Sequence, residues 1–215
     1  MKKTRELRQE LIATMRAMNA QGINQGKSGN GSVRQGEGFL ITPAAIAYDA
    51  LTADDIVAMD FDGEWQGSPG ARPSSEWRFH RDILAGRTEI NAVLHTHGRA
   101  VTTLACMKRS IPAFHYMVAI AGGNDIRCSG YATFGTQELS DLAQQALTGR
   151  KACLMAHHGL ITLGTTLCEA FAIAMEVEHL ADVYWRTLQL GEPEILADAE
   201  MELVLERFRT GYQHP

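Results

Sequence analysis

The sequence predicts a layered α/β domain whose central sheet is largely antiparallel. Two observations lead to this prediction: strand hairpins recur in the first half of the chain, and helices interrupt the strands throughout. This order differs from the regular strand and helix alternation of a doubly wound sheet. The 215 residues, 45% hydrophobic and 21% charged, suffice for one sizeable core, so residues 1–215 are expected to form a single domain.

Apolar spacing and turn residues define the elements of the first half. The N-terminal segment repeats apolar side chains at helical spacing and meets a stop at Gly22. The stretch "GNGSVRQGEGFLITP" is typical of a strand hairpin closed by Pro43, and "IVAMDFDGEWQG" of a second hairpin that turns at Asp62 and Gly63. The loop in "PSSEWRFHRDILAGR" leads into a helix that stops at Gly86, and the strand "NAVLHTH" follows.

The second half is richer in helices. We expect a helix over residues 98–106, a loop or strand at "SIPAFHYMVAIAGGNDI", and a helix from about Gln137 to Leu147. The stretch "KACLMAHHGLITLG" indicates one buried strand that ends in polar groups. The longest helix then opens with Thr166 and Glu169 in capping-box spacing, and a last short helix lies near residues 198–208.

Composition excludes several classes of function. The net charge is -5 and the charges are interspersed, so no surface for nucleic acid or an anionic membrane is predicted. The charged N-terminus "MKKTRELRQELIATMRAMNAQG" lacks a signal-peptide core, and no run approaches the roughly 18 apolar residues of a membrane span. We therefore expect a cytoplasmic protein with a small-molecule ligand. The four cysteines form no CxxC pair and are expected to be reduced thiols.

Histidines at two strand ends predict a metal site. In a strand, His95 and His97 would point to the same face and grip one ion. The motif "AHHGL" supplies His158 after a second apolar run, with Gly159 allowing a tight turn beside the ion, and Glu76 in "PSSEWRFH" is a nearby carboxylate. Three such ligands with an open position suit a catalytic zinc. The alternative for each histidine is a hydrogen-bonded core residue.

The other histidines carry less information. His80 and His179 fall on helices, where solvated or structural roles dominate, and His214 is in the tail. His115 stands beside Tyr116 and is the one of this group that merits attention.

A divalent ion with an open position supports two kinds of chemistry. A carboxylate base that removes a proton α to a metal-bound carbonyl generates an enediolate, which is aldol chemistry. An ion that instead delivers hydroxide performs hydrolysis. The hydrolytic motif H-E-x-x-H is absent, so the sequence favours a lyase over a hydrolase. A Walker loop and a Gly-x-Gly-x-x-Gly after a strand are absent as well, so neither a nucleoside triphosphate nor a dinucleotide is implied.

Ordered motifs across nearly the whole chain resemble the class II aldolase and adducin-head family, above all its L-fuculose-1-phosphate aldolase branch. They are "GNGSVR", "GFLITP", "PSSEWRFH", "AVLHTH", "RSIPAFHYM", "AGGNDI", "YATFGTQELS" and "HHGLI". The resemblance implies a three-layer domain, one zinc ion per subunit and a cytoplasmic homotetramer with active sites between subunits. It also implies retro-aldol cleavage of a sugar phosphate, such as L-fuculose 1-phosphate or a related deoxy-ketose phosphate, to dihydroxyacetone phosphate and an aldehyde.

The resemblance assigns roles to the residues that match the motifs. His95, His97 and His158 match the three histidine ligands of the metal. Glu76 matches the carboxylate that binds the metal and, once substrate displaces it, acts as the base. Tyr116 matches the tyrosine that a neighbouring subunit contributes at the aldehyde end of the substrate.

Further matches concern the two ends of the substrate. Asn30, Ser74 and Ser75 match side chains that hold the phosphate, although an ordinary glycine-rich turn is the alternative for the segment around Asn30. Phe134 matches an aromatic wall of the pocket, with plain core packing as its alternative. Proximity alone suggests that Lys27 adds positive charge to the phosphate pocket.

The chain departs from the family pattern at two places. The phosphate loop normally continues with a hydroxyl residue and a glycine, whereas this chain has Ala44 and Ala45. This removes one phosphate contact and adds a methyl group where the backbone approaches an oxygen, and the sequence leaves open whether the loop still binds phosphate. At the C-terminus, Tyr212 falls one place later than the family's tail tyrosine, and Gly211 takes that position.

Other functions fit the same motifs. Within this fold, an epimerase, a decarboxylase or a dehydratase of a sugar phosphate would use the same ligands, as would an aldolase whose substrate lacks the usual phosphate. A non-catalytic adducin-type interaction domain predicts loss of the ligands, yet all four are present. Imidazole and carboxylate ligands suit manganese and cobalt as well as zinc.

Overall fold

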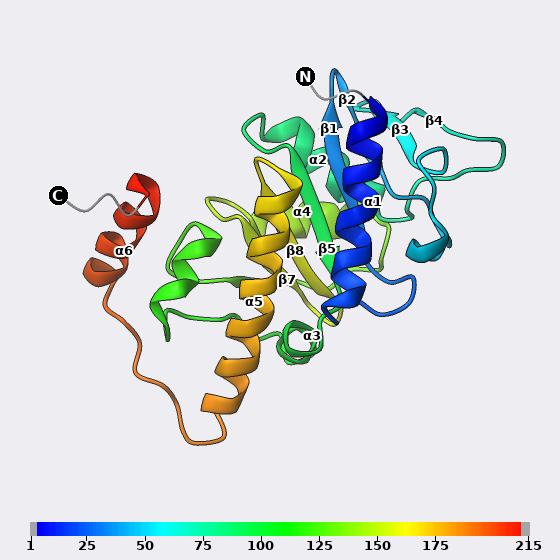
Figure 1. The fold of residues 1–215 in the computed structure, drawn as a ribbon. Coiled ribbons are helices and arrows are strands. Elements are labelled where there is room, and N and C mark those ends of the chain that lie inside the picture. The colour runs from blue at the N-terminus through cyan, green and yellow to red at the C-terminus, as the bar shows by residue number, and fades with distance from the viewer. Residues whose placement is uncertain (1–3, 212–215) are drawn as a thin grey trace.

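A single eight-stranded sheet organises the protein, which is a computed structural model describing residues 4–211 (Figure 1). The strands are β1 Asn30–Gln35, β2 Gly38–Ile41, β3 Val57–Asp60, β4 Trp65–Gln66, β5 Ala92–Thr96, β6 Arg127–Ser129, β7 Ala152–Met155 and β8 Gly159–Gly164. Their order in the sheet is β4-β3-β2-β1-β5-β8-β7-β6. Every pairing is antiparallel except that of β6 with β7, so the prediction of a largely antiparallel sheet is confirmed.

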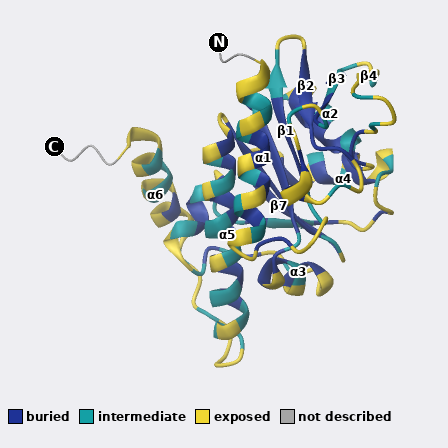
Figure 2. Cartoon of the chain, turned by 45° about the vertical axis from the view of Figure 1, so that its right-hand side comes forward, coloured by how far each residue is buried: buried dark blue, intermediate teal, exposed yellow. Residues whose placement is uncertain are grey.

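Helices cover both faces of this sheet and make the three layers. On one face lie α1 (Thr4–Ala20), α3 (Arg99–Cys106) and α5 (Leu167–Thr187), and on the other lie α2 (Trp77–Gly86) and α4 (Gln137–Ala146). The last helix, α6 (Asp198–Thr210), stands apart from the sheet and packs on the 3₁₀ helix η2 (Tyr116–Ala121), as Figure 1 shows. The central strands are buried between the layers, while the edge strand β4 and the outer sides of the helices are exposed (Figure 2).

Alternation along β1 directs polar side chains to one layer. Gly31 faces α1, where an added Cβ would lie 2.9 Å from the Met15 sulfur, and Val33 joins the same core. Asn30 and Ser32 therefore point to the opposite face, toward α2. Asn30 is paired directly with His95 of β5 in the antiparallel register, so the polar end of β1 meets the histidine end of β5.

Two expected elements differ from the structure. The stretch 151–164, predicted as one strand, is the hairpin of β7 and β8, closed by the His158 N–H group donating to the Met155 carbonyl and by His157 with a φ of 56°. Its uniform apolar pattern hides this turn, because both strands are buried on both faces. The region predicted as loop or strand contains η2, which opens with the His115 side chain accepting from the Met117 N–H group and ends at Gly122 in the left-handed conformation.

No helix in the part of the chain that the structure describes combines the length and the hydropathy needed to cross a membrane.

Candidate active site

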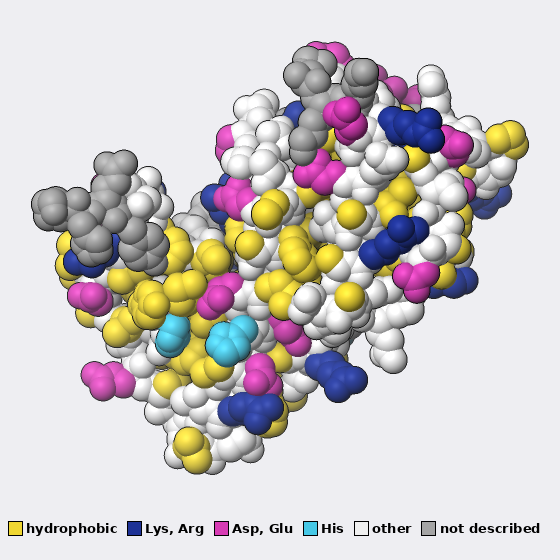
Figure 3. Space-filling model, in the orientation of Figure 1, with side chains coloured by type: hydrophobic (Ala, Val, Ile, Leu, Met, Phe, Trp, Pro, Cys, Tyr) yellow, Lys and Arg dark blue, Asp and Glu magenta, His cyan; other side chains and the backbone are white. Residues whose placement is uncertain are grey.

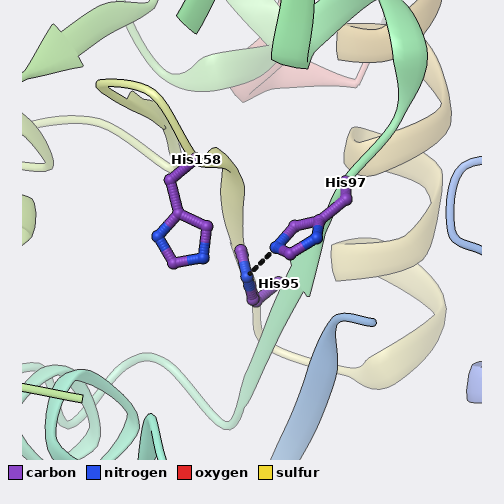
Figure 4. Close-up of side chains that lie close together, drawn as sticks. All are labelled: His95, His97 and His158. Carbon is purple, nitrogen blue, oxygen red and sulfur yellow. Dashed lines mark hydrogen bonds between the residues drawn. The ribbon is translucent and has the colours of Figure 1, made fainter. Parts of the chain in front are cut away.

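Three histidines converge where β5 and the β7–β8 turn end. The potential ligand atoms of His95, His97 and His158 all lie within 4.8 Å of one another. Their rings turn toward a common point, and the Nε2 atoms of His95 and His97 are 2.8 Å apart (Figure 4). The structure therefore brings together the three histidines that the sequence predicts as ligands.

Glu76, at the start of α2, lies next to this histidine cluster. It is the residue before the first turn of α2, is only 6% exposed, and makes no side-chain capping bond to the helix. Its Oε2 lies 3.3 Å from His95 Nε2, and its Oε1 lies 3.2 Å from His158 Nε2. A buried carboxylate thus straddles two imidazoles, and Oε1 accepts no hydrogen bond.

Burial keeps the histidine cluster neutral. Burial, helped by His97, lowers the pKa of His95 to about 3, and burial, helped by His95, lowers the pKa of His158 to about 4. Burial also lowers the pKa of His97. Neutral imidazoles are the form that binds a metal, so these three side chains could bind a cation near neutral pH without first losing a proton.

Hydrogen bonding sets which nitrogen His95 presents. Its Nδ1 lies 2.9 Å from the Leu160 carbonyl of β8, so Nδ1–H donates and Nε2 carries the lone pair that faces the cluster. The short contact to His97 is then a His97 Nε2–H group that donates to His95 Nε2. A bound cation would replace that hydrogen bond.

The donor set fits a divalent transition-metal ion. Three imidazole nitrogens and one carboxylate face each other, and the buried Oε1 of Glu76 has no hydrogen-bond partner among the described residues. Nitrogen and oxygen ligands of this kind suit zinc, and manganese and cobalt as well.

Gly159 supports the cluster differently from the sequence-based expectation. The tight turn beside the ligands belongs to His157, whose φ is 56°. Gly159 instead permits close packing, since an added Cβ would lie 2.2 Å from the Thr96 carbonyl and 2.9 Å from His97 Cδ2. Any side chain at this position would push the two histidine-bearing strand ends apart.

A cavity of about 350 Å³ opens above the cluster. It contains all the predicted phosphate-loop and wall residues in the described chain, namely Lys27, Asn30, Ala44, Ala45, Ser74, Ser75 and Phe134. Phe134 is 65% exposed, so its packing in the core is excluded. Ala45 has a φ of 65° and thus keeps the left-handed conformation that a glycine would favour, so the loop has the backbone shape of a glycine turn without the glycine.

Two further residues of this cavity were missed by the sequence reasoning. Tyr131 and His157 line it and pack edge to face, with ring centroids 5.7 Å apart. The available signal for His157 was its position beside the predicted ligand His158 in the doublet before Gly159. Tyr131 had only its place in "YATFGTQELS" to distinguish it.

Tyr116 does not line this cavity within its own chain. Tyr116 is 48% exposed and lies on η2, beside a separate and mostly apolar hollow that α6 lines with Leu203 and Val204. Figure 3 shows hydrophobic side chains gathered beside α6 on this face. A role of Tyr116 in the active site of a neighbouring subunit stays a prediction, and Tyr212 lies outside the described residues.

The chain is similar in sequence and fold to known proteins of one family. Residues 9–185 match the family profile described as the class II aldolase and adducin N-terminal domain. A 5-methylthioribulose-1-phosphate/5-deoxyribulose-1-phosphate aldolase of Rhodospirillum rubrum is 57% identical over 204 residues, which cover 95% of this chain and 91% of that protein. An L-fuculose phosphate aldolase of Escherichia coli K12 is 47% identical over 206 residues, or 95% of each chain. The solved structure of an L-fuculose 1-phosphate aldolase superposes with a TM-score of 0.92 at 39% identity and covers 95% of this chain and 96% of its own.

Proposed function

This chain belongs to the class II aldolase and adducin N-terminal domain family, and from that premise we propose that it cleaves a deoxy-ketose 1-phosphate to dihydroxyacetone phosphate and an aldehyde. The chain is a class II aldolase, a carbon–carbon lyase. The observation that carries the proposal is the buried carboxylate of Glu76 placed against a histidine triad at the floor of a cavity.

His95, His97 and His158 would hold the metal, which we propose is zinc, with Glu76 as a further ligand in the absence of substrate. When bound, the ion supplies a Lewis acid that polarises the substrate carbonyl and stabilises negative charge on its oxygen. Because burial keeps the imidazoles neutral, they offer lone pairs at the pH of the cytoplasm, where we expect the enzyme to work.

Glu76 is proposed to move the proton. In the cleavage direction the bond between C3 and C4 of the ketose breaks, and its electron pair stays on the dihydroxyacetone phosphate fragment. Protonated Glu76 then gives its proton to C3, and in the synthetic direction the carboxylate removes the same proton. Oε1, which accepts no hydrogen bond from residues 4–211, is the oxygen available for this transfer.

The lining of the cavity supports a substrate with a phosphate and an apolar tail. Lys27, Ser74 and Ser75 line it and offer a cation and two hydroxyl groups for the phosphate. Exposed aromatic rings of Tyr131 and Phe134 line the cavity as well and suit an apolar substituent on the aldehyde fragment. We therefore place 5-deoxyribulose and 5-methylthioribulose 1-phosphates first, in agreement with the 57% identical relative, and L-fuculose 1-phosphate second.

A homotetramer is part of the proposal. Tyr116 is exposed and lies outside the cavity of its own chain, so it would complete the site of a neighbouring subunit, where its hydroxyl would orient the oxygen at the aldehyde end of the substrate and, in the synthetic direction, donate its proton to that oxygen. The apolar hollow between η2 and α6 is the kind of surface that a subunit contact covers.

A substrate panel with product identification tests the reaction. The purified enzyme is incubated with the three ketose 1-phosphates and their unphosphorylated analogues, and the products are identified by mass spectrometry. We expect dihydroxyacetone phosphate and the matching aldehyde, with the 5-deoxy substrates cleaved most efficiently. Epimerised, decarboxylated or dehydrated products would overturn the proposed aldolase reaction on these substrates, and a clear preference for unphosphorylated ketoses would overturn the phosphate assignment.

A separate measurement tests the role of Glu76. Glu76→Gln is expected to retain the metal while exchange of the C3 proton of dihydroxyacetone phosphate with deuterated water slows by about 10²- to 10⁴-fold, the usual contribution of a general base. Exchange at the wild-type rate would rule Glu76 out as the base. Metal analysis of protein purified without chelator, with loss of activity on chelation and its return with zinc, tests the metal.

A further inference from the structure

A chain of hydrogen bonds runs from the base into the interior of the protein. Asn30 Nδ2 lies 2.8 Å from Glu76 Oε2, His80 Nε2 lies 2.5 Å from Asn30 Oδ1, and Ser32 Oγ lies 2.8 Å from His80 Nδ1. All four residues are buried, and His80 and Ser32 have no exposed surface. His80 was expected from the sequence to be a solvated or structural helix residue, but the structure places it next to the residue that holds the base.

The chemistry of these groups permits one arrangement of the hydrogens when Glu76 is ionised. A carboxylate only accepts, so Asn30 Nδ2 donates to Glu76 and turns its carbonyl oxygen toward His80. That oxygen also only accepts, so the His80 Nε2–H group must donate to it. His80 is neutral because burial holds its pKa well below the ordinary value, and its Nδ1 accepts from the Ser32 hydroxyl.

Two secondary-structure elements hold this chain in register. Glu76 and His80 are four residues apart and fall one turn apart at the start of α2. Asn30 and Ser32 are two residues apart on β1 and point to the same face of the sheet. The spacing of one helix turn therefore matches the spacing of one strand repeat, so the two pairs meet side by side. Glu76 and Asn30 lie nearer to the histidine cluster than His80 and Ser32 do, and Asn30 is opposite His95 in the sheet.

We propose that His80 is a positioning residue for proton transfer, which acts by fixing the orientation of the Asn30 amide. If the Asn30 amide turned over, its oxygen would face the Glu76 carboxylate, which is also an acceptor, and its NH₂ group would face the His80 Nε2–H donor. Both hydrogen bonds would be lost, so the His80 donor opposes this rotation. The amide nitrogen therefore holds Oε2, and Oε1 stays directed at the cluster without a hydrogen bond of its own. Loss of His80 would free the amide to rotate and the carboxylate to leave its reactive position.

This inference rests on the proposed role of Glu76 as base, and a mutant cycle with Asn30 tests it. His80→Leu removes the donor, whereas His80→Gln keeps an N–H donor and an acceptor oxygen on one side chain. We expect His80→Leu to lower kcat and the rate of C3 proton exchange on the order of tenfold, as loss of an outer partner of a ligand does, with KM and bound metal little changed. His80→Gln should recover most of the loss.

The cycle separates positioning from simple loss of structure. In an Asn30→Ala background, His80→Leu should change kcat by less than about twofold, because its effect passes through the missing amide. A full tenfold loss in that background, or a single His80→Leu variant with wild-type kcat, would overturn the inference. His179→Gln, at an exposed histidine of α5, is the matched control and should leave kcat unchanged.

A measurement on the unmodified enzyme does not depend on whether His80→Leu folds. In ¹⁵N-imidazole spectra of the wild-type holoenzyme, His80, assigned by its absence from His80→Gln, should be the neutral tautomer with its proton on Nε2. A proton on Nδ1, or on both nitrogens, would overturn the inference. If the wild-type enzyme exchanges no C3 proton, the proposed function is wrong. If the wild type and the His80→Leu variant are equally active, the proposed function stands and only the role of His80 is wrong.

Discussion

Acidification of the metal-free protein from pH 7.5 to 5.5 is expected to lower its free energy of unfolding steeply. In the folded protein the pKa of His95 is lowered to about 3 and that of His158 to about 4. In the unfolded chain both imidazoles return to a pKa of about 6.5. Between these values the unfolded chain binds protons that the folded chain does not, so stability is lost as the pH falls through about 6.5 and continues to fall toward the folded values.

The size of the effect follows from the proton difference. Over the two pH units from 7.5 to 5.5, each of these histidines contributes a loss of about 1.3 kcal/mol, or about 2.6 kcal/mol for His95 and His158 together. Burial also lowers the pKa values of His97 and His80, and both shifts act in the same direction. Most carboxylates add little above pH 5.5, because their ordinary pKa values are near 4, whereas burial raises the pKa of Glu178 and this shift acts in the opposite direction.

Urea denaturation of chelator-treated protein at pH 7.5, 6.5 and 5.5, at one protein concentration, measures this loss. His158→Gln should reduce it by about 1.3 kcal/mol, while His179→Gln, at an exposed position, should leave it unchanged. A wild-type loss below about 1 kcal/mol would refute the conclusion that burial keeps the cluster neutral.

Three further substitutions test single features of the site. Ala45→Gly should raise the free energy of unfolding, measured by urea titration, by about 0.5–1 kcal/mol. Alanine is strained in the left-handed conformation at φ 65°, and the energy gained by relieving this strain exceeds the entropy that glycine adds to the unfolded chain. A lower free energy of unfolding would contradict this. Lys27→Gln should raise KM for the phosphorylated ketose about two- to fivefold, as loss of an exposed ion pair does, and leave KM for the unphosphorylated analogue unchanged; equal changes would remove Lys27 from the phosphate site. Gly159→Ala should cost about 1–3 kcal/mol or more and weaken metal binding measured by titration, since its Cβ would lie 2.2 Å from the Thr96 carbonyl; wild-type affinity and stability would show that the strand ends tolerate separation.

Most helices and hairpins were predictable because local signals mark them. Thr166 accepts a hydrogen bond from the Glu169 N–H group at the start of α5, as the capping-box spacing predicts. Asp60 accepts from three N–H groups of the β3–β4 turn, where Asp62 and Gly63 indicated a hairpin. Helix caps and tight turns involve neighbours in the chain, so residue types at short spacing suffice to identify them.

The split of 151–164 into two strands was not predictable in the same way. The turn between β7 and β8 contains no Asn-Gly or Asp-Gly pair, and its left-handed residue is His157 instead of a glycine. Burial on both faces also removes the alternation that would separate one strand from the next. The surrounding structure holds His157 in its left-handed conformation. Local residue propensities carry no information about that surrounding structure.

The sequence by itself determined the ligand chemistry: the spacing of His95 and His97 and the doublet that ends in His158 were sufficient to nominate a metal site, since alternation along a strand is a local property. Only the tertiary structure decided what surrounds it. The pairing of β1 with β5 sets Asn30 against His95, and the packing of α2 on that face brings His80 to the Asn30 amide, 50 residues away in the chain. Contacts of this kind depend on sheet order and helix packing, which arise from burial of the whole core and leave no short-range mark in the sequence.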